Sequence, residues 1–437
     1  MRYTNLISDM KKHTVLFVIL FTVFFSYPVR GQIIDKTLNN ANLYKEYFFL
    51  DPLVFYDKDS TGGKLDLYIE ILQQNLMFKK NSATGDFEAN LDFVIAIKNS
   101  KNSIVVNQAN TELVSIPKSD IKRIEDRSYF SLKQFNLPPE YYTINFTLRD
   151  KNNNTEYKKD VSFAVKERGI DNLFFSDVML LSDVKVGAGK EKEITPLVNN
   201  NVGSLKEFYF FFEVISKYDT AVNRAYYYKI TDDKSKTLYQ DTLTCEFLPG
   251  VNQIFQKIPT DNLYIGNFKL EVYDSRALHT GKYFTYKWGN IPVNMNDIDL
   301  AINQLVYIAS EDELDKIKEG KTKEERQRRF VKFWRDKDPS PKTPKNELMM
   351  EYYNRIKIAN ERYSHYVEGW KTDMGMVFII FGNPGNIERH PFDGNSKPYE
   401  IWDYYNVNRQ FIFIDDSGYG DYRLLTPIWD ERTKIRY

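Results

Sequence analysis

Acidic and histidine side chains near the carboxyl terminus are the residues of this sequence that could support hydrolysis. Hydrolases use two carboxylates that face the same bond, or a Ser or Cys nucleophile beside a base. Glu400 and Asp403 are three positions apart on a predicted strand, so their side chains point to opposite faces and form no pair locally. His365 and His390 flank a distinctive motif, but the sequence has no recognisable nucleophile elbow. We therefore predict no catalytic residue.

Metal and cofactor chemistry has few candidate residues. One Cys and four His in 437 residues exclude a Cys-rich zinc site and make a His-built metal centre improbable. Asp415 and Asp416 lie in a predicted hairpin turn, where Asp is expected, and the loop lacks the spaced carboxylates of a known calcium motif. Basic and acidic residues number 60 each, so no net charge favours nucleic acid. We predict no metal, no cofactor and no nucleic-acid partner.

The segment 369–373, Gly-Trp-Lys-Thr-Asp, is the most specific local feature. Thr372 and Asp373 can bond backbone amides of their own loop, Gly369 permits unusual dihedrals, and Trp370 is a large apolar anchor. These properties predict that Trp370 is buried between a helix over 347–366 and a strand over 376–381, with Asp373 accepting amides of the loop. A binding site on this loop is the alternative.

The surroundings of this motif resemble the GWxTD-domain family of bacterial envelope proteins, over about residues 294–437. Gly369, Trp370, Thr372 and Asp373 match the naming motif. Further matches, in order, are the segments 333–341, 346–347, 359–360, 382–384, 399–402 and 411–418. The resemblance implies an envelope protein with β-domains in front and supplies no catalytic residue. The candidate binding residues are Trp334, Asp338, Gly369, Trp370, Thr372, Asp373 and Asn383.

Helical signals precede the motif, over 297–366. Ser310 with Glu313 and Thr322 with Glu325 have the spacing of capping boxes, and Asn346 is placed to cap a further helix. Basic residues between 326 and 335 could bind an acidic partner, but their acidic neighbours favour a solvated helix face. After the motif, alternating segments predict an antiparallel meander over 376–425, packed on the helices in an α+β module.

Two β-domains are predicted in front, over 32–167 and 168–293. Alternating apolar residues in 65–71 and 142–148, separated by turn clusters, are typical of immunoglobulin-like or fibronectin-like β-sandwiches. Three pairs of segments match in the same order: 68–71 with 211–214, 97–101 with 230–234, and 137–148 with 258–270. They predict two copies of one sandwich, with chance similarity between sandwiches as the alternative.

Residues 1–31 have the features of a secretory signal peptide. A basic pair precedes an apolar run, Val15 to Phe25, that is too short to span a bilayer, and Val29 and Gly31 suit a signal peptidase site before Gln32. An uncleaved anchor is the alternative. No Cys follows the run, so we expect a protein that is not a lipoprotein, located in the periplasm or at the outer cell surface, with no transmembrane segment after cleavage.

The sequence thus predicts a multidomain, mainly β protein, with two β-sandwiches followed by a helical segment and an α+β meander module. The function it favours is an exported, non-enzymatic interaction or scaffold protein of the bacterial cell envelope, whose partner is an unknown envelope protein or glycan. The alternative is an envelope hydrolase that acts on a glycan or peptide near the 369–375 loop.

Overall fold

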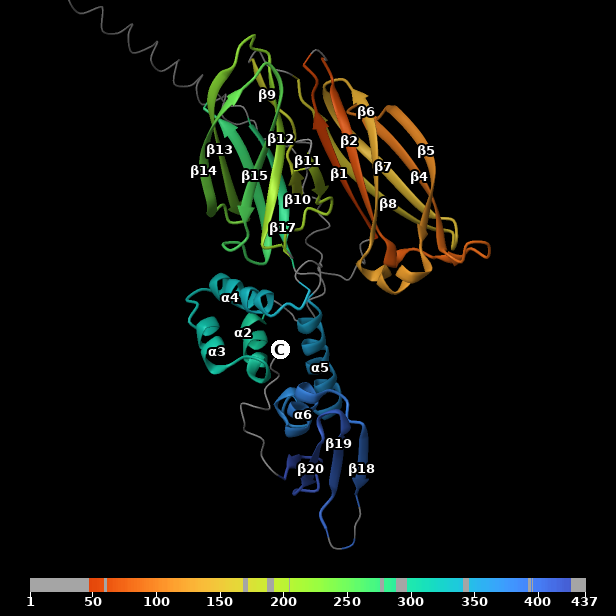
Figure 1. The fold of residues 1–437 in the computed structure, drawn as a ribbon, viewed down its shortest axis with the longest axis vertical. Coiled ribbons are helices and arrows are strands. Elements are labelled where there is room, and N and C mark those ends of the chain that lie inside the picture. The colour runs from red at the N-terminus through yellow and green to blue at the C-terminus, as the bar shows by residue number, and fades with distance from the viewer. Residues whose placement is uncertain are drawn as a thin grey trace, which may run out of the picture.

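The computed structural model describes residues 47–58, 61–167, 172–186, 192–203, 205–275, 279–287, 297–340, 346–391, 394 and 396–425. The predicted signal peptide and its cleavage site lie outside these ranges. The protein is mainly β, with several antiparallel sheets and a few helices towards the C-terminus. Two β-domains lie side by side at one end, helices occupy the middle and a small sheet forms the other end (Figure 1). No described helix is long and apolar enough to cross a membrane.

The first β-domain consists of two antiparallel sheets around one core. One sheet has the order β1 (Phe48–Phe55), β2 (Gly63–Leu72), β6 (Ser128–Leu137). The other contains β3 (Lys79–Lys80), β4 (Phe87–Asn99), β7 (Glu140–Asp150) and β8 (Thr155–Val165), with β5 (Ile104–Ile116) also paired to β4. Short 3-10 helices η2 (Gln73–Asn75) and η3 (Lys118–Asp126) connect them. Buried side chains from both sheets, such as Leu67, Ile95 and Phe146, share the core.

The second β-domain repeats this arrangement. One sheet has the order β11 (Lys192–Pro196), β10 (Met179–Val186), β12 (Glu207–Ser216), β15 (Gly250–Pro259), with β9 (Leu173–Phe175) also paired to β12. The other has the order β14 (Thr237–Phe247), β13 (Val222–Asp232), β16 (Gly266–Asp274), β17 (His279–Tyr286). The aromatic run in β12 is buried, with Phe208, Phe210 and Phe212 fully enclosed in the core.

The predicted internal repeat agrees with these strand orders, because β5-β4-β7-β8 corresponds to β14-β13-β16-β17. The hairpins at the start of these sheets match in detail. Both have one residue with positive φ, Asn102 at 62° and Ser235 at 64°. The register shifts at the same place, after Ile97 in one and after Ile230 in the other. Each matched pair of segments in the sequence therefore falls on corresponding strands.

The two β-domains pack through the strand β1, which is buried on both faces. Leu50 and Val54 point into the first core, whereas Leu53 and Phe55 join a second cluster with β10 and β12 of the other domain. Asp51 forms a buried ion pair with Lys282 of β17. Burial raises the pKa of the Asp51 carboxyl, and the Lys282 ammonium opposes that shift.

The helical segment contains α2 (Ile298–Asn303), η5 (Gln304–Tyr307), α3 (Glu311–Lys318), α4 (Lys323–Asp336) and α5 (Glu347–Tyr363). The predicted caps are confirmed at three helices. Ser310 and Glu313 form a complete capping box at α3, and Asn346 accepts the Met349 amide at α5. Thr322 caps α4, but the Glu325 carboxylate accepts the amide of Lys321 instead of closing a box.

The predicted strand over 376–381 is wrong: these residues belong to a helix, α6 (Asp373–Phe381). A short apolar run does not distinguish a buried strand from a buried helix. The capping residues decide the matter, because the Thr372 hydroxyl accepts the Gly375 amide at the start and Gly382, at φ 79°, ends the helix. The predicted motif loop therefore joins two helices, through the 3-10 helix η6 (Gly369–Lys371).

The C-terminal sheet begins at residue 386, not at 376. Its antiparallel strands run in sequence order: β18 (Asn386–His390), β19 (Tyr399–Tyr404), β20 (Arg409–Asp415) and β21 (Tyr422–Leu424), with the 3-10 helix η7 (Tyr405–Val407) between β19 and β20. Tyr363 of α5 joins the sheet to α6, since its ring lies 5.5 Å from that of Trp402 and 5.7 Å from that of Phe378.

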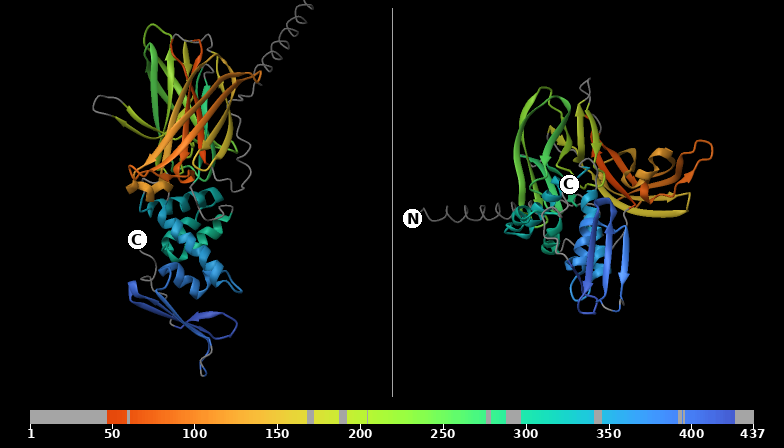
Figure 2. Two further views of the ribbon diagram at one scale, coloured as in Figure 1. Left: turned by 90° about the vertical axis from the view of Figure 1, so that its right-hand side faces the viewer. Right: turned by 60° about the horizontal axis from the view of Figure 1, so that its bottom comes forward.

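One hydrophobic cluster extends from Leu173 to Leu424, through the second β-domain, the helices and the C-terminal sheet. Polar contacts follow the same path. Arg335 of α4, with a side chain 12% exposed, donates to Thr260 Oγ1 at 3.0 Å, and Arg328 donates to the Asn262 carbonyl. The basic residues of α4 are therefore not simply a solvated face, because part of them joins the helices to the second β-domain. The helices lie directly below the β-domains in the left view of Figure 2.

Candidate functional site in the Gly-Trp-Lys-Thr-Asp loop

Gly369 brings the loop against the end of α5. Its amide donates to Ser364 Oγ at 2.7 Å, and the next amide, of Trp370, donates to Asn360 Oδ1 at 3.0 Å. A Cβ atom on Gly369 would lie 1.9 Å from the Ala359 carbonyl oxygen, so no other residue fits without moving the backbone. The glycine is therefore required for close approach, not for an unusual dihedral.

Trp370 is buried, as predicted, with 7% of its surface exposed. Its 3-10 helix η6 packs against α5 and against α6. The second neighbour is thus the helix α6 and not the predicted strand over 376–381. The Trp370 carbonyl accepts the hydroxyl of Tyr307 at 2.8 Å, which adds η5 to the contacts. Burial, with a smaller effect of Asp373, raises the pKa of Tyr307 to about 12, so the phenol stays a donor at neutral pH.

Thr372 holds the two halves of the loop together. Its hydroxyl donates to the Gly369 carbonyl at 2.8 Å and accepts the Gly375 amide at 3.0 Å. Gly375 is as constrained as Gly369, because a Cβ there would lie 1.8 Å from the Gly369 carbonyl oxygen. The Thr372 side chain is buried, and both hydrogen bonds of its hydroxyl are made to backbone groups of the loop and the first turn of α6.

Asp373 connects the loop to the C-terminal sheet. Its carboxylate accepts the amide of Leu424 on β21 at 2.8 Å, across 51 residues of sequence. The prediction that Asp373 accepts amides of its own loop is wrong, because Thr372 takes that role. A carboxylate at the first turn of α6 is also favoured by the helix dipole.

The structure does not gather the other predicted binding residues into this loop. Trp334 is fully buried in α4, against the rings of Tyr352 and Tyr353. Asp338 follows α4 and accepts the Ser340 amide at 2.8 Å, and burial raises its pKa. Asn383 is exposed beyond the end of α6.

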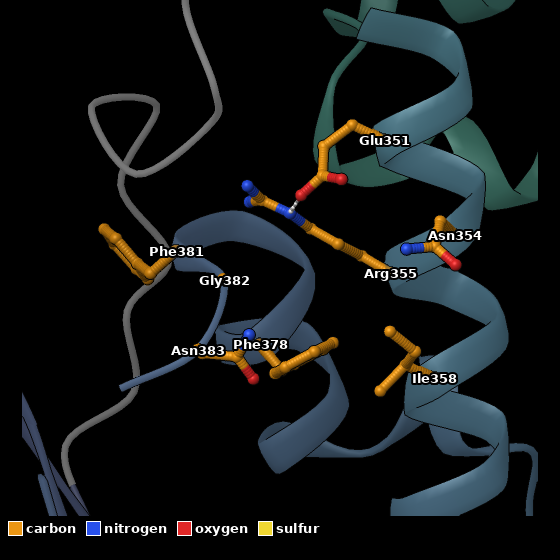
Figure 3. Close-up of a pocket in the computed structure, with 8 residues that line it drawn as sticks. All are labelled: Glu351, Asn354, Arg355, Ile358, Phe378, Phe381, Gly382 and Asn383. Carbon is orange, nitrogen blue, oxygen red and sulfur yellow. Dashed lines mark hydrogen bonds and ion pairs between the residues drawn. The ribbon is translucent and has the colours of Figure 1, made fainter. Parts of the chain in front are cut away.

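A depression of about 260 Å³ lies between α5 and α6 (Figure 3). Arg355 extends across it, donating to Glu351 Oε1 at 2.7 Å and to the carbonyls of Ile379 and Ile380 at 3.1 and 3.3 Å. The guanidinium therefore caps the C-terminal end of α6. Arg355 is not among the residues predicted from the sequence, although the Glu351–Arg355 spacing of four is a helix ion-pair signal.

Further carboxylates with raised pKa values lie between the two β-domains. Asp66, Glu70 and Glu213 accept hydrogen bonds from the side chains of Gln134 at 3.0 Å, Ser128 at 2.7 Å and Gln253 at 3.4 Å respectively, and Asp66 also lies 3.7 Å from Lys64 Nζ. Burial raises the pKa of each. No group of three or more His, Cys, Asp or Glu side chains suited to a metal ion occurs within the described residues.

Comparisons with known proteins identify one domain. Residues 275–418 match the family model of the GWxTD domain. No curated protein matches the chain. Solved structures align at low similarity. Red sea bream transglutaminase matches at 10% identity and a TM-score of 0.17, over 54% of this chain and 31% of that one. Escherichia coli alpha-2-macroglobulin matches at 10% identity and a TM-score of 0.19, over 57% of this chain and 17% of that one, and Amycolatopsis orientalis exo-chitosanase CsxA at 9% identity and a TM-score of 0.15, over 54% and 26%.

The present chain spans less than a third of each of these structures, and superpositions of this quality support no argument about fold or function. The family match begins before the predicted boundary at 294 and takes in β17, the last strand of the second β-domain. Its motif is the loop whose contacts are described above. The chain therefore contains a GWxTD domain, extending from the last strand of the second β-domain to the turn after β20.

Proposed function

We propose that this chain is a non-enzymatic interaction or scaffold protein, exported to the bacterial cell envelope. The proposal rests on the hydrogen bonds that the polar groups of the motif make within the protein. The Gly369 and Trp370 amides, the Thr372 hydroxyl and the Asp373 carboxylate each bond another part of the protein. Groups engaged in this way fix the packing of α5, α6 and β21, so the motif acts as a structural junction.

The contacts between domains support the same proposal. The buried Asp51–Lys282 pair and the cluster around Leu53 join the two β-domains, and one core continues into the GWxTD domain. A protein assembled in this way presents long β-surfaces in fixed relative positions. Immunoglobulin-like or fibronectin-like sandwiches, which we propose for both β-domains, suit such a role.

The alternative, a hydrolase with a site near the 369–375 loop, requires a carboxylate free to act on a substrate. Asp373 accepts a backbone amide, and Arg355 is bonded to the end of α6. Among the carboxylates whose pKa values burial raises, Asp66 and Glu70 lie between the β-domains, and Asp338 accepts the Ser340 amide after α4. These positions favour the scaffold over the hydrolase.

The test of the proposal measures the melting temperature and the capture of partners separately for each variant. We expect Asp373→Asn to lower the melting temperature while the folded protein still captures the same partners from envelope extract as the wild type. Asn383→Ala, at an exposed position beyond the end of α6, serves as the control and should change neither property. A motif variant that melts like the wild type but loses a partner contradicts the proposal, as does hydrolysis of a glycan or peptide by the purified protein.

A further inference from the structure

Strand β5 is a free sheet edge on the outside of the first β-domain. It has 13 residues, pairs only with β4 among the described strands, and lies on the right-hand side of the molecule in Figure 1. A free edge offers a row of backbone donors and acceptors to any other strand. Natural proteins usually protect long edges with Lys, Pro or other charged side chains.

The outward face of this edge carries no charged side chain. The sequence of β5 contains no Lys, Arg or Pro, and its one charged residue, Glu112, points inward. The Glu112 carboxylate is held there by Lys133 Nζ at 2.6 Å and Tyr129 OH at 2.6 Å on β6. Three apolar side chains of β5 are instead exposed: Ile104 by 56%, Val105 by 47% and Leu113 by 54%.

The internal repeat provides a comparison within the same chain. The matching register shifts place β5 on β14 with an offset of 133 residues, so Glu112 corresponds to Cys245. Strand β14 is also a sheet edge, but it exposes the charged residues Asp241 and Glu246. Of these two corresponding edges, only β5 is left without an exposed charge, so it is the one better suited to pair with another strand.

We propose that β5 pairs antiparallel with β5 of a second copy of this chain, with Ala109 on the two-fold axis. In that register Val105 faces Leu113 and Asn107 faces Thr111, so the outward row of one copy complements that of the other. Isologous pairing of this kind requires a self-complementary surface, which the outward side chains of β5 provide. No extended foreign segment is needed to explain the pattern.

The inward-facing side chains suit the same register. Gln108 of one copy faces Asn110 of the other, and Asn110 Nδ2 is a buried donor with no acceptor within the described residues. Glu112 faces Val106, so the two Glu112 carboxylates are not opposed. The pairing thus opposes no like charges across the two-fold axis. It is independent of the proposed scaffold function, because β5 lies outside the GWxTD domain.

Sedimentation and light scattering of the purified protein over a range of concentrations test the proposal. We expect a dimer that Ala109→Lys weakens by roughly tenfold or more, because the two-fold axis places the two introduced charges directly opposite each other. Thr242→Lys, at the corresponding exposed position of β14, is the matched control and should leave the dimer intact. A monomer at all concentrations, or a dimer that Ala109→Lys leaves unchanged, overturns the proposal.

Cross-linking tests the register. Opposed residues in antiparallel strands have Cα atoms about 4.5–5.5 Å apart, within reach of a disulfide. In a Cys245→Ser background, we expect Ala109→Cys to give a disulfide-linked dimer, whereas Val105→Cys should not, because it faces residue 113. Equal cross-linking of both variants would refute this register. A monomer that instead binds an extended peptide at β5 would refute pairing between copies.

Discussion

Replacing Thr372 by Val removes the hydroxyl that joins the two halves of the motif loop and leaves a side chain of the same shape. The Gly369 carbonyl keeps a donor, because the Thr372 amide also reaches it at 3.1 Å. The Gly375 amide, however, is left without its acceptor, Thr372 Oγ1. An unsatisfied buried amide costs about 1–3 kcal/mol, which agrees with the cost of about 0.5–2 kcal/mol for a lost N-cap.

Thermal unfolding measures this loss. In a domain of about 150–250 residues each kcal/mol corresponds to about 2–4 °C, so the melting temperature should decrease by several degrees. Thr372→Ser keeps the oxygen and loses only a methyl group, and we expect it to be less destabilising than Thr372→Val. If both variants lose the same stability, the hydroxyl is not the cause. If Thr372→Val melts like the wild type, the capping argument fails.

Three further predictions concern the core, the domain boundary and pH. Trp370→Ala should cost about 3–5 kcal/mol in chemical denaturation, as deletions of buried aromatic side chains do; a loss below about 1 kcal/mol would contradict its burial. A fragment over 294–437 should give no cooperative melt, because its core continues into the second β-domain, whereas a fragment from 172 onward should melt cooperatively. Burial raises the pKa of Asp66 although Lys64 Nζ lies 3.7 Å away, so its ionisation destabilises the fold above that pKa; Asp66→Asn should therefore increase stability at pH 8 and lose this advantage as the pH falls through the raised pKa, and a gain independent of pH would exclude the charge as its cause.

Local signals in the sequence predicted the parts of this fold that depend on neighbouring residues. Ser310 and Asn346 were identified as helix caps because a cap needs only a side chain and the amides of the next turn. The antiparallel strands between residues 48 and 286 are likewise indicated by alternation and turns. The helix α6 was missed because its apolar run is buried nearly all round, which removes the amphipathic period that separates helix from strand.

The contacts of the candidate site were harder to predict because they join distant parts of the chain. Burial of Trp370 could be expected from its size and its position beside a glycine. The partner of Asp373 could not, because Leu424 is 51 residues away and donates only a backbone amide, which any residue type supplies. Arg335 was read as a surface charge because the sequence does not show that Thr260 lies opposite it.

Strand β17 has a mechanical consequence for the whole molecule. It is an integral strand of the second β-domain, Lys282 on it bonds Asp51 of the first, and it is also the first strand of the matched GWxTD domain. The hydrophobic core is continuous from the C-terminal sheet to the second β-domain. A force applied to the C-terminal sheet is therefore transmitted to β17, which contacts both β-domains. Displacing the C-terminal sheet should therefore also displace the β-domains, because the shared core couples the two ends of the molecule.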